Sequence, residues 1–222
     1  NRGHARCNAF GIRYVLQKKD FDYLILMDGD GEDRPIEIKS LVEAINNKPT
    51  VSVVAKRVKR SEGIFFKTSY EIHKILTYVF TGKKINFGNY SCLTKNDINE
   101  LSNKSSLWNS FSGSIKKYLL DYDTINSIRG KRYFGPSKMS FLKLLIHSLS
   151  IIAVFKETVF LRSVLLLIVS SYFTFKINYA IAIFQLLLVV FNLIIYLISL
   201  KESKEGLIQS ESNVESINVY TQ

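Results

Sequence analysis

The segment of this 222-residue chain best suited to chemistry contains closely spaced carboxylates. Asp28, Asp30 and Glu32 alternate with glycines in the segment DGDGED, directly after the apolar run YLILM. Alternate side chains of an extended segment point the same way, and gathered carboxylates repel each other unless a cation lies among them. Hard oxygen ligands suit Mg²⁺ or Mn²⁺. The spacing predicts a divalent-metal site, with a solvated acidic turn that caps the next helix as the alternative.

Basic residues accompany this acidic segment. Residues 51–85 hold eight basic and two acidic side chains, including Lys56, Arg57 and Arg60 after a second apolar run. A further basic set lies near residues 129–138: Arg129, Lys131, Arg132 and Lys138. A metal beside fixed cations suits a diphosphate, because the metal bridges phosphate oxygens and arginines bind the others. Attraction to anionic lipid headgroups is the alternative. Nucleic acid is not expected as a partner, since no binding module is recognisable.

Alternating helices and strands would position these groups. Residues 23–27 and 50–55 are short apolar runs typical of buried strands. Residues 5–17, 35–46 and 67–80 have helical spacing, and Pro35 suits a first helical turn. In residues 67–80, Ile72, Ile75, Leu76 and Val79 share one side. The order predicts an α/β sheet, with the acidic segment at the carboxyl end of a strand, where such sheets bind ligands.

The end of the chain has a different composition. Residues 1–157 hold 26 basic and 15 acidic side chains, whereas residues 158–222 hold four of each. Residues 179–200 carry no charge, and residues 158–175 are apolar except for Arg162, which could reach the headgroups. Because about 20 apolar residues cross a bilayer as a helix, we expect a transmembrane hairpin over residues 157–200. Lysines after it place both ends on the cytoplasmic side. A buried helical hairpin is the alternative.

Two flanking segments complete the predicted organisation. Residues 139–156 form a third apolar run, in which Lys143 and His147 share a helical face; an interfacial helix fits it best, with a buried core helix as the alternative. Residues 201–222 are polar and are expected to be disordered.

Several motifs, in one order, resemble those of a known family. They are Asn1-Arg2-Gly3-His4 with Gly11, then LILMDGDGEDRP, Lys56-Arg57, Phe87-Gly88-Asn89-Tyr90 and the segment RYFGPSK at residues 132–138. This set is similar to membrane-anchored, family 2 inverting glycosyltransferases related to dolichyl- and polyprenyl-phosphate sugar synthases, over about residues 1–200. The resemblance implies a GT-A-like, Rossmann-type sheet and a nucleotide-sugar donor.

The resemblance also implies roles for individual residues. Asp28 and Asp30 match the donor- and metal-binding aspartates, with Glu32 where relatives often have Gln. Arg57 and Arg60 match basic positions near the phosphates, and His4 matches a donor-site position. Arg132, Ser137 and Lys138 match a phosphate-binding segment beside the membrane. Relatives commonly have Asp where this chain has Asn89, and Asn cannot act as a general base. A polyprenyl phosphate needs no base, because it is already anionic.

The resulting prediction is a glycosyltransferase with three open points. Residues 1–138 are expected to be the C-terminal portion of the catalytic domain, whose first strands and nucleobase pocket have no counterpart here, so the activity of this chain alone is open. The acceptor is expected to be a membrane lipid phosphate, with a glycan hydroxyl as the alternative. A non-catalytic, membrane-tethered remnant of a transferase is the third possibility.

Overall fold

A mixed four-stranded sheet organises the first half of the chain. The computed structural model describes residues 3–59, 64–135, 140–172 and 179–210. The strand order is β1 (Tyr23–Leu26), β3 (Phe87–Thr94), β2 (Val53–Lys59) and β4 (Asp123–Ile128). Strand β3 runs antiparallel to both neighbours, while β2 and β4 are parallel. The α/β class and the two predicted strands are therefore confirmed. Neither β3 nor β4 was predicted, and the antiparallel β3 makes the sheet mixed.

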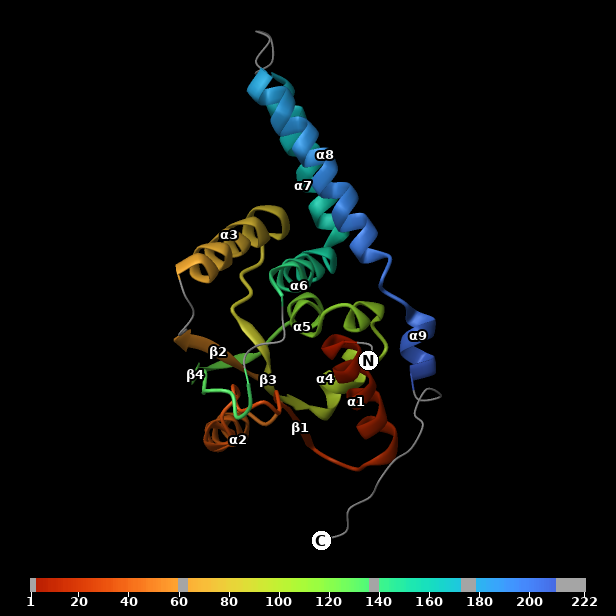
Figure 1. The fold of residues 1–222 in the computed structure, drawn as a ribbon. Coiled ribbons are helices and arrows are strands. Elements are labelled where there is room, and N and C mark those ends of the chain that lie inside the picture. The colour runs from red at the N-terminus through yellow and green to blue at the C-terminus, as the bar shows by residue number, and fades with distance from the viewer. Residues whose placement is uncertain (1–2, 60–63, 136–139, 173–178, 211–222) are drawn as a thin grey trace.

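Helices cover both faces of this sheet (Figure 1). A 3₁₀ turn at Pro35–Glu37 leads into α2 (Ile38–Asn47), which packs on one face. Helices α1 (His4–Lys18), α4 (Lys95–Ser102) and α5 (Phe111–Tyr118) pack on the other face. The result is a three-layer α/β domain of the kind expected for a GT-A-like fold.

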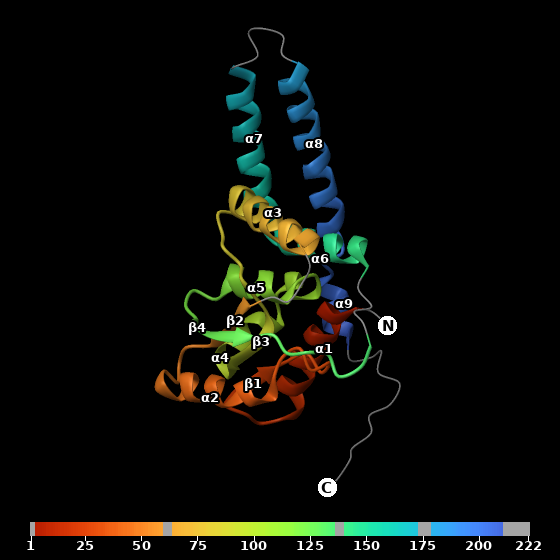
Figure 2. The ribbon, with the colours of Figure 1, turned by 60° about the vertical axis from the view of Figure 1, so that its left-hand side comes forward.

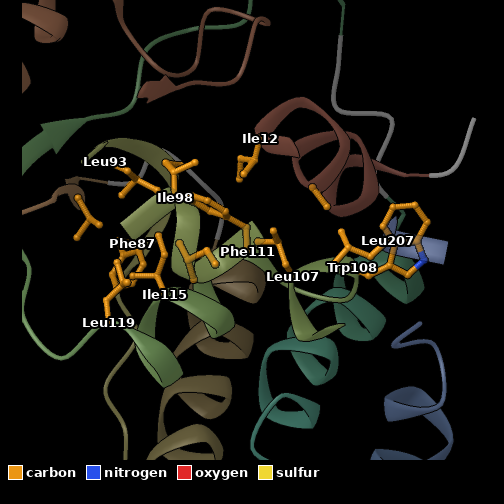
Figure 3. Packing of buried hydrophobic residues seen from close by; sticks show 13 residues of the cluster. Ile12, Phe87, Leu93, Ile98, Leu107, Trp108, Phe111, Ile115, Leu119 and Leu207 are labelled. Atoms are coloured by element: carbon orange, nitrogen blue, oxygen red, sulfur yellow. The ribbon is translucent and has the colours of Figure 1, made fainter. Parts of the chain in front are cut away.

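Alternating side chains of the strands build two separate cores. Val53 and Ala55 pack with Leu41 of α2, whereas Val54 between them points into the core under α1, α4 and α5. In that second core, Leu93 of β3 lies among side chains from α1, α4 and α5 (Figure 3). This period of two is what a strand buried on both faces requires.

A separate group of helices lies beyond the sheet. Helices α3 (Ile64–Thr81), α6 (Phe141–Ala153), α7 (Lys156–Tyr172) and α8 (Tyr179–Ser199) share their own apolar cluster. Figure 2 shows α7 and α8 side by side, projecting away from the sheet, with α3 and α6 crossing near their base.

The apolar side of α3 differs from the sequence-based expectation. Leu76 packs into the helical cluster, but Ile72, Ile75 and Val79 are 42–62% exposed. The helix contacts α6 and α7 rather than the sheet, so most of its predicted apolar side faces outward.

One helix among the described residues is long and apolar enough to cross a membrane. It lies in the stretch Tyr179–Ile208, which consists of α8 and the short helix that follows it, and this is a finding of length and composition alone. Helix α7 is paired with α8 but does not meet the same measure, so a second transmembrane span is not shown. Arg162 of α7 does not extend outward: its guanidinium donates to the carbonyl of Val79 at 2.9 Å and thereby caps the end of α3.

The segment after α8 is ordered as far as residue 210, contrary to the expected disorder of residues 201–222. Ser203 caps the short helix α9 (Lys204–Ile208) through the amide of Gly206. Leu207 of α9 is fully buried in the core that contains Trp108 (Figure 3). Composition did not reveal the helix, because the stretch is polar and Leu207 is the buried residue of α9. Residues 211–222 lie outside the described part.

Candidate active site

One edge of the sheet gathers the chemically interesting residues. Strands β1, β2 and β4 all end there, and the antiparallel β3 begins there, as the pairings Leu26 with Ser91, Lys56 with Phe87 and Lys59 with Ile128 require. The sequence-predicted position of the acidic segment, at the carboxyl end of a strand, is therefore correct. The mixed topology adds the start of β3 to this edge, which sequence reasoning could not anticipate.

Asp28 and Asn89 contact each other across this edge. Asn89 Nδ2 donates to Asp28 Oδ1 at 3.1 Å. The amide is thus directed at a carboxylate that remains one-third exposed. Asn89 here orients Asp28, and no carboxylate stands at position 89 to accept a proton.

Asp33 holds the acidic loop in place from beneath. Its Oδ2 accepts the backbone N–H of Asp28 at 2.9 Å, and its side chain is only 4% exposed. Burial raises the pKa of this carboxyl group, and the nearby Asp28 raises it further, while the hydrogen bond from the Asp28 amide and the charge of Arg57 oppose the rise. An acidic turn that caps the next helix was the alternative to a metal site, but the residue before the 3₁₀ turn is Arg34, and it makes no side-chain cap.

Arg57 joins this group from β2. Its Nη2 lies 3.9 Å from both Asp28 Oδ2 and Asp33 Oδ1. The guanidinium passes directly over Gly88, where an added Cβ would come within 2.7 Å of Nη2. Asp28, Arg57 and Asn89, three residues predicted for the site from sequence, are therefore brought together.

The other two carboxylates of the acidic loop face a second loop. Arg132 pairs with Asp30 Oδ2 at 3.0 Å and with Glu32 Oε2 at 3.1 Å. Arg129 also pairs with Glu32. Backbone bonds from Gly130 to Glu32 and from Tyr133 to Asp30 hold the two loops together. The loop after β4 thus lies across the acidic loop and neutralises it.

Glycine is required where these loops meet. Gly31 has a φ of +90°, and a Cβ there would lie 2.8 Å from the ring of Tyr133. A side chain at this position would meet both a steric clash and an unfavourable backbone conformation. The small size of Gly31 therefore lets the two loops approach closely enough for Arg129 and Arg132 to pair with the acidic loop.

Glu37 fixes the end of β4 next to the site. This largely buried carboxylate accepts hydrogen bonds from Ser127 Oγ at 2.6 Å, the Ile128 amide at 2.9 Å and Arg34 Nη2 at 2.5 Å. Burial alone would raise its pKa, but these hydrogen bonds outweigh burial and lower the pKa. Sequence reasoning missed Glu37, because in the sequence it looks like an ordinary polar residue of a helical turn.

The predicted metal ligands do not form one set. Asp28 faces Asn89 and Arg57, while Asp30 and Glu32 face Arg132. Among the described residues, no three acidic, histidine or cysteine side chains are gathered to hold a metal ion. The arrangement therefore does not fit a cation held by Asp28, Asp30 and Glu32 together, and no reaction step is derived through one.

Histidines from two helices, α1 and α6, contact each other. The rings of His4 in α1 and His147 in α6 make an edge-to-face contact with centroids 4.9 Å apart. The pKa of His147 is lowered to about 4, mainly by burial and also by the charges of His4, His73 and Arg57, while the charge of Asp28 acts in the opposite direction. Burial also lowers the pKa of His4, against the charge of Asp28. His4 was predicted for the donor site, whereas His147 was expected on an interfacial helix.

Three predicted site residues lie outside the described part of the chain. They are Arg60, Ser137 and Lys138. Their expected contacts with phosphate groups stay predictions.

Comparison with known proteins agrees with the geometry of this edge. A search of curated proteins finds no match to the chain. The family model described as Glycosyl transferase family 2 matches residues 1–111, which is half of the chain and includes the acidic loop, Arg57 and Asn89. A nucleotide-sugar donor and an acceptor follow from membership. The chain belongs to glycosyl transferase family 2 and is a glycosyltransferase.

Proposed function

We propose that this glycosyltransferase moves a sugar from a nucleotide-sugar donor to a polyprenyl phosphate in the membrane, with inversion. An oxygen of the lipid phosphate attacks the anomeric carbon, and the bond to the nucleoside diphosphate breaks with its electron pair leaving on that diphosphate. Arg57 stabilises the charge that develops on the leaving group. The product would serve the synthesis of cell-envelope or surface glycans.

The contact between Asn89 and Asp28 is the observation that carries this proposal. A hydroxyl acceptor must lose a proton as it attacks, so it needs a general base at the site. Position 89 offers an amide, and that amide is already directed at Asp28. A phosphate acceptor has no proton to lose at neutral pH, and it therefore suits a site in which this position has no base.

The helix pair supports an acceptor that resides in a membrane. Helix α8 is long and apolar enough to span a bilayer. The chain then returns to the catalytic domain, because α9 buries Leu207 in the same core as Trp108. Helix α7 starts beside that domain as well, so a spanning α8 requires a spanning α7. The exposed apolar side chains of α7, which include Phe160, Leu161 and Leu165, fit this arrangement. We therefore place the catalytic domain on the cytoplasmic face of a two-span protein.

A divalent cation stays a prediction at this site. The pairing of Asp30 and Glu32 with arginines means that the protein alone does not present a three-carboxylate set. The proposed reaction therefore uses Arg57 and includes no step that requires the cation.

Product extraction tests the proposal directly. Membranes containing the full-length protein are incubated with Mn²⁺, polyprenyl phosphate and a panel of labelled nucleotide sugars. We expect label in the organic phase with one sugar, and loss of transfer with Asp30→Ala, which removes the partner of Arg132 in the acidic loop. The matched control is Asp20→Ala, which removes an exposed aspartate whose partner is Lys95 at the surface.

The remaining outcomes separate the alternatives. Label that enters only a water-soluble glycan would establish a hydroxyl acceptor and overturn the lipid-phosphate assignment. Unchanged lipid labelling with Asp30→Ala would show that the acidic loop is not the donor site. Absence of both labelling and nucleotide binding in folded protein would favour a non-catalytic remnant.

A further inference from the structure

The three histidines of this chain lie on separate helices, and the rings of His4 and His147 contact each other with centroids 4.9 Å apart. His4 begins α1, His73 lies in α3 and His147 lies in α6. Helices α3 and α6 contact each other and belong to the same apolar cluster as α7 and α8. His147 is partly buried, whereas Phe141, Leu142 and Leu145 on the same helix are 43–63% exposed. The histidine therefore faces inward, toward the site, from a helix whose outer side is apolar.

The groups around His147 are mostly positive or able to become positive, so an anion is what this position lacks. Arg57 carries a fixed positive charge, and His4 and His73 add two groups that can become positive. Asp28 is a negative group that acts on both His147 and His4, but it is already engaged by Asn89 and lies near Arg57. Nitrogen donors gathered around a buried position repel one another when protonated, and an entering anion removes that repulsion.

We propose that His147, together with His4 and His73, forms a pocket that binds the phosphate monoester of the lipid acceptor. This inference rests on the proposed function and names residues for its acceptor side. Imidazole N–H groups donate hydrogen bonds to phosphate oxygens, and such charge-assisted bonds are among the stronger ones. The apolar outer sides of α3 and α6 provide a surface along which the lipid chain can approach.

The location separates this pocket from the donor's diphosphate. The acidic loop and the arginines of the loop after β4 lie on the sheet side, and they pair with each other through Asp30, Glu32 and Arg132. His73 and His147 instead lie on α3 and α6, which share an apolar cluster with α7 and α8. Arg57 and Asp28 stand between the two regions, where the bond to the sugar must form.

Magnetic resonance of the imidazoles tests the pocket without relying on turnover. The full chain, labelled in its three histidines and held in detergent micelles, gives one imidazole signal for each residue. Farnesyl phosphate is expected to shift the signals of His147 and His4 toward the protonated form, in a saturable manner. Farnesol, which lacks the phosphate, is the control ligand and should leave them in place. Shifts of equal size with farnesol, or shifts with a nucleoside diphosphate alone, would overturn the proposal.

Kinetics provide the second measurement. His147→Leu should raise KM for farnesyl phosphate by about tenfold or more, because leucine has no donor and a hydrogen bond to a charged group is lost, while KM for the donor stays constant. Lys143→Gln, an exposed position one turn earlier on α6, is the matched control and should leave both constants unchanged. An equal rise in KM for the donor, or no change in either KM together with unshifted imidazoles, would refute the assignment.

The two measurements also distinguish this inference from the proposed function. If farnesyl phosphate shifts the imidazoles but no nucleotide sugar supports transfer, the phosphate pocket stands and the proposed reaction fails. If transfer to the lipid proceeds and the imidazoles do not respond, the reaction stands and the pocket assignment is wrong.

Discussion

Gly88 offers a way to move Arg57 without changing it. The guanidinium of Arg57 lies over Gly88, where an added Cβ would come within 2.7 Å of Nη2 and 3.0 Å of Cζ. Ordinary van der Waals contact begins at about 3.4 Å, so Gly88→Ala requires the guanidinium to withdraw by about 0.7 Å. The obstacle is the end of a flexible side chain rather than backbone, and the strand itself can accept alanine. The substitution should therefore displace the charge and spare the fold.

The size of the effect follows from that displacement. A misplacement approaching 1 Å at a reacting centre can cost about 10² in rate, and complete removal of a charge-stabilising group costs about 10²–10³. We therefore expect Gly88→Ala to lower kcat by about 10- to 100-fold, which is less than the loss caused by Arg57→Ala. Thermal unfolding should change little, because the distant ion pairs of Arg57 with Asp28 and Asp33 are weak at 3.9 Å.

A second glycine provides the control. Gly11 lies within α1, and an added Cβ there has no neighbour within 4 Å. Gly11→Ala should leave kcat unchanged and stabilise the helix by roughly 0.5–1 kcal/mol. The assay compares transfer from the labelled nucleotide sugar for Gly88→Ala, Gly11→Ala and Arg57→Ala, beside their melting temperatures. Wild-type kcat in Gly88→Ala, with activity lost in Arg57→Ala, would refute the claim that Gly88 sets the position of the guanidinium.

Three further predictions address stability, pH and metal. Leu207→Ala should lower the free energy of unfolding in urea by about 2–5 kcal/mol, because Leu207 is fully buried. Ile208 in the same helix is 49% exposed, so Ile208→Ala should change stability by less than about 0.5 kcal/mol. Equal effects of the two substitutions would contradict the docking of α9. The folded protein favours neutral His147, with a pKa of about 4 against 6.5, so the unfolded chain binds the proton first and stability is lost as pH falls from 6.5 toward 4. Urea unfolding at pH 5 and pH 7 should show a slope of up to about 1.4 kcal/mol per pH unit from this group, and His147→Gln should flatten it; an unchanged slope would refute the shift. Transfer measured in EDTA, before and after addition of Mn²⁺, tests the predicted cation: full activity in EDTA would exclude it, while a loss that Mn²⁺ reverses would require Arg132 to release Asp30 and Glu32 to the cation.

The sequence was most informative where a local pattern decides the structure. The apolar run before Asp28 predicted both β1 and the location of the acidic loop at its carboxyl end. The helical spacing of residues 5–17 and 35–46 predicted α1 and α2, apart from the 3₁₀ turn that starts at Pro35. In these segments the period of apolar residues and the position of proline are determined by neighbours in the chain.

Contacts between distant segments could not be predicted in this way. Asp33 and Glu37 look like solvated acidic residues in sequence, yet both are buried and hold backbone amides near the site. His147 lies 143 positions after the histidine that its ring contacts, and no spacing rule connects them. The apolar stripe of α3 was visible, but a stripe indicates only that something apolar covers it and not whether that is a sheet or a membrane.

Arg162 connects α7 to α3, and α3 in turn connects two strands that carry site residues. Its hydrogen bond to Val79 ties the end of α3 to α7, and Gly82 leaves room for the guanidinium at that joint. The chain enters α3 after the strand that carries Arg57 and leaves it toward the strand that carries Asn89. If α7 and α8 span the bilayer as proposed, a bilayer thicker or thinner than their hydrophobic length would tilt both helices, and the hydrogen bond of Arg162 would pass that tilt to α3 and to the two strands. Turnover in vesicles should therefore peak at one acyl-chain length, and Arg162→Ala should broaden the peak by uncoupling catalysis from membrane thickness.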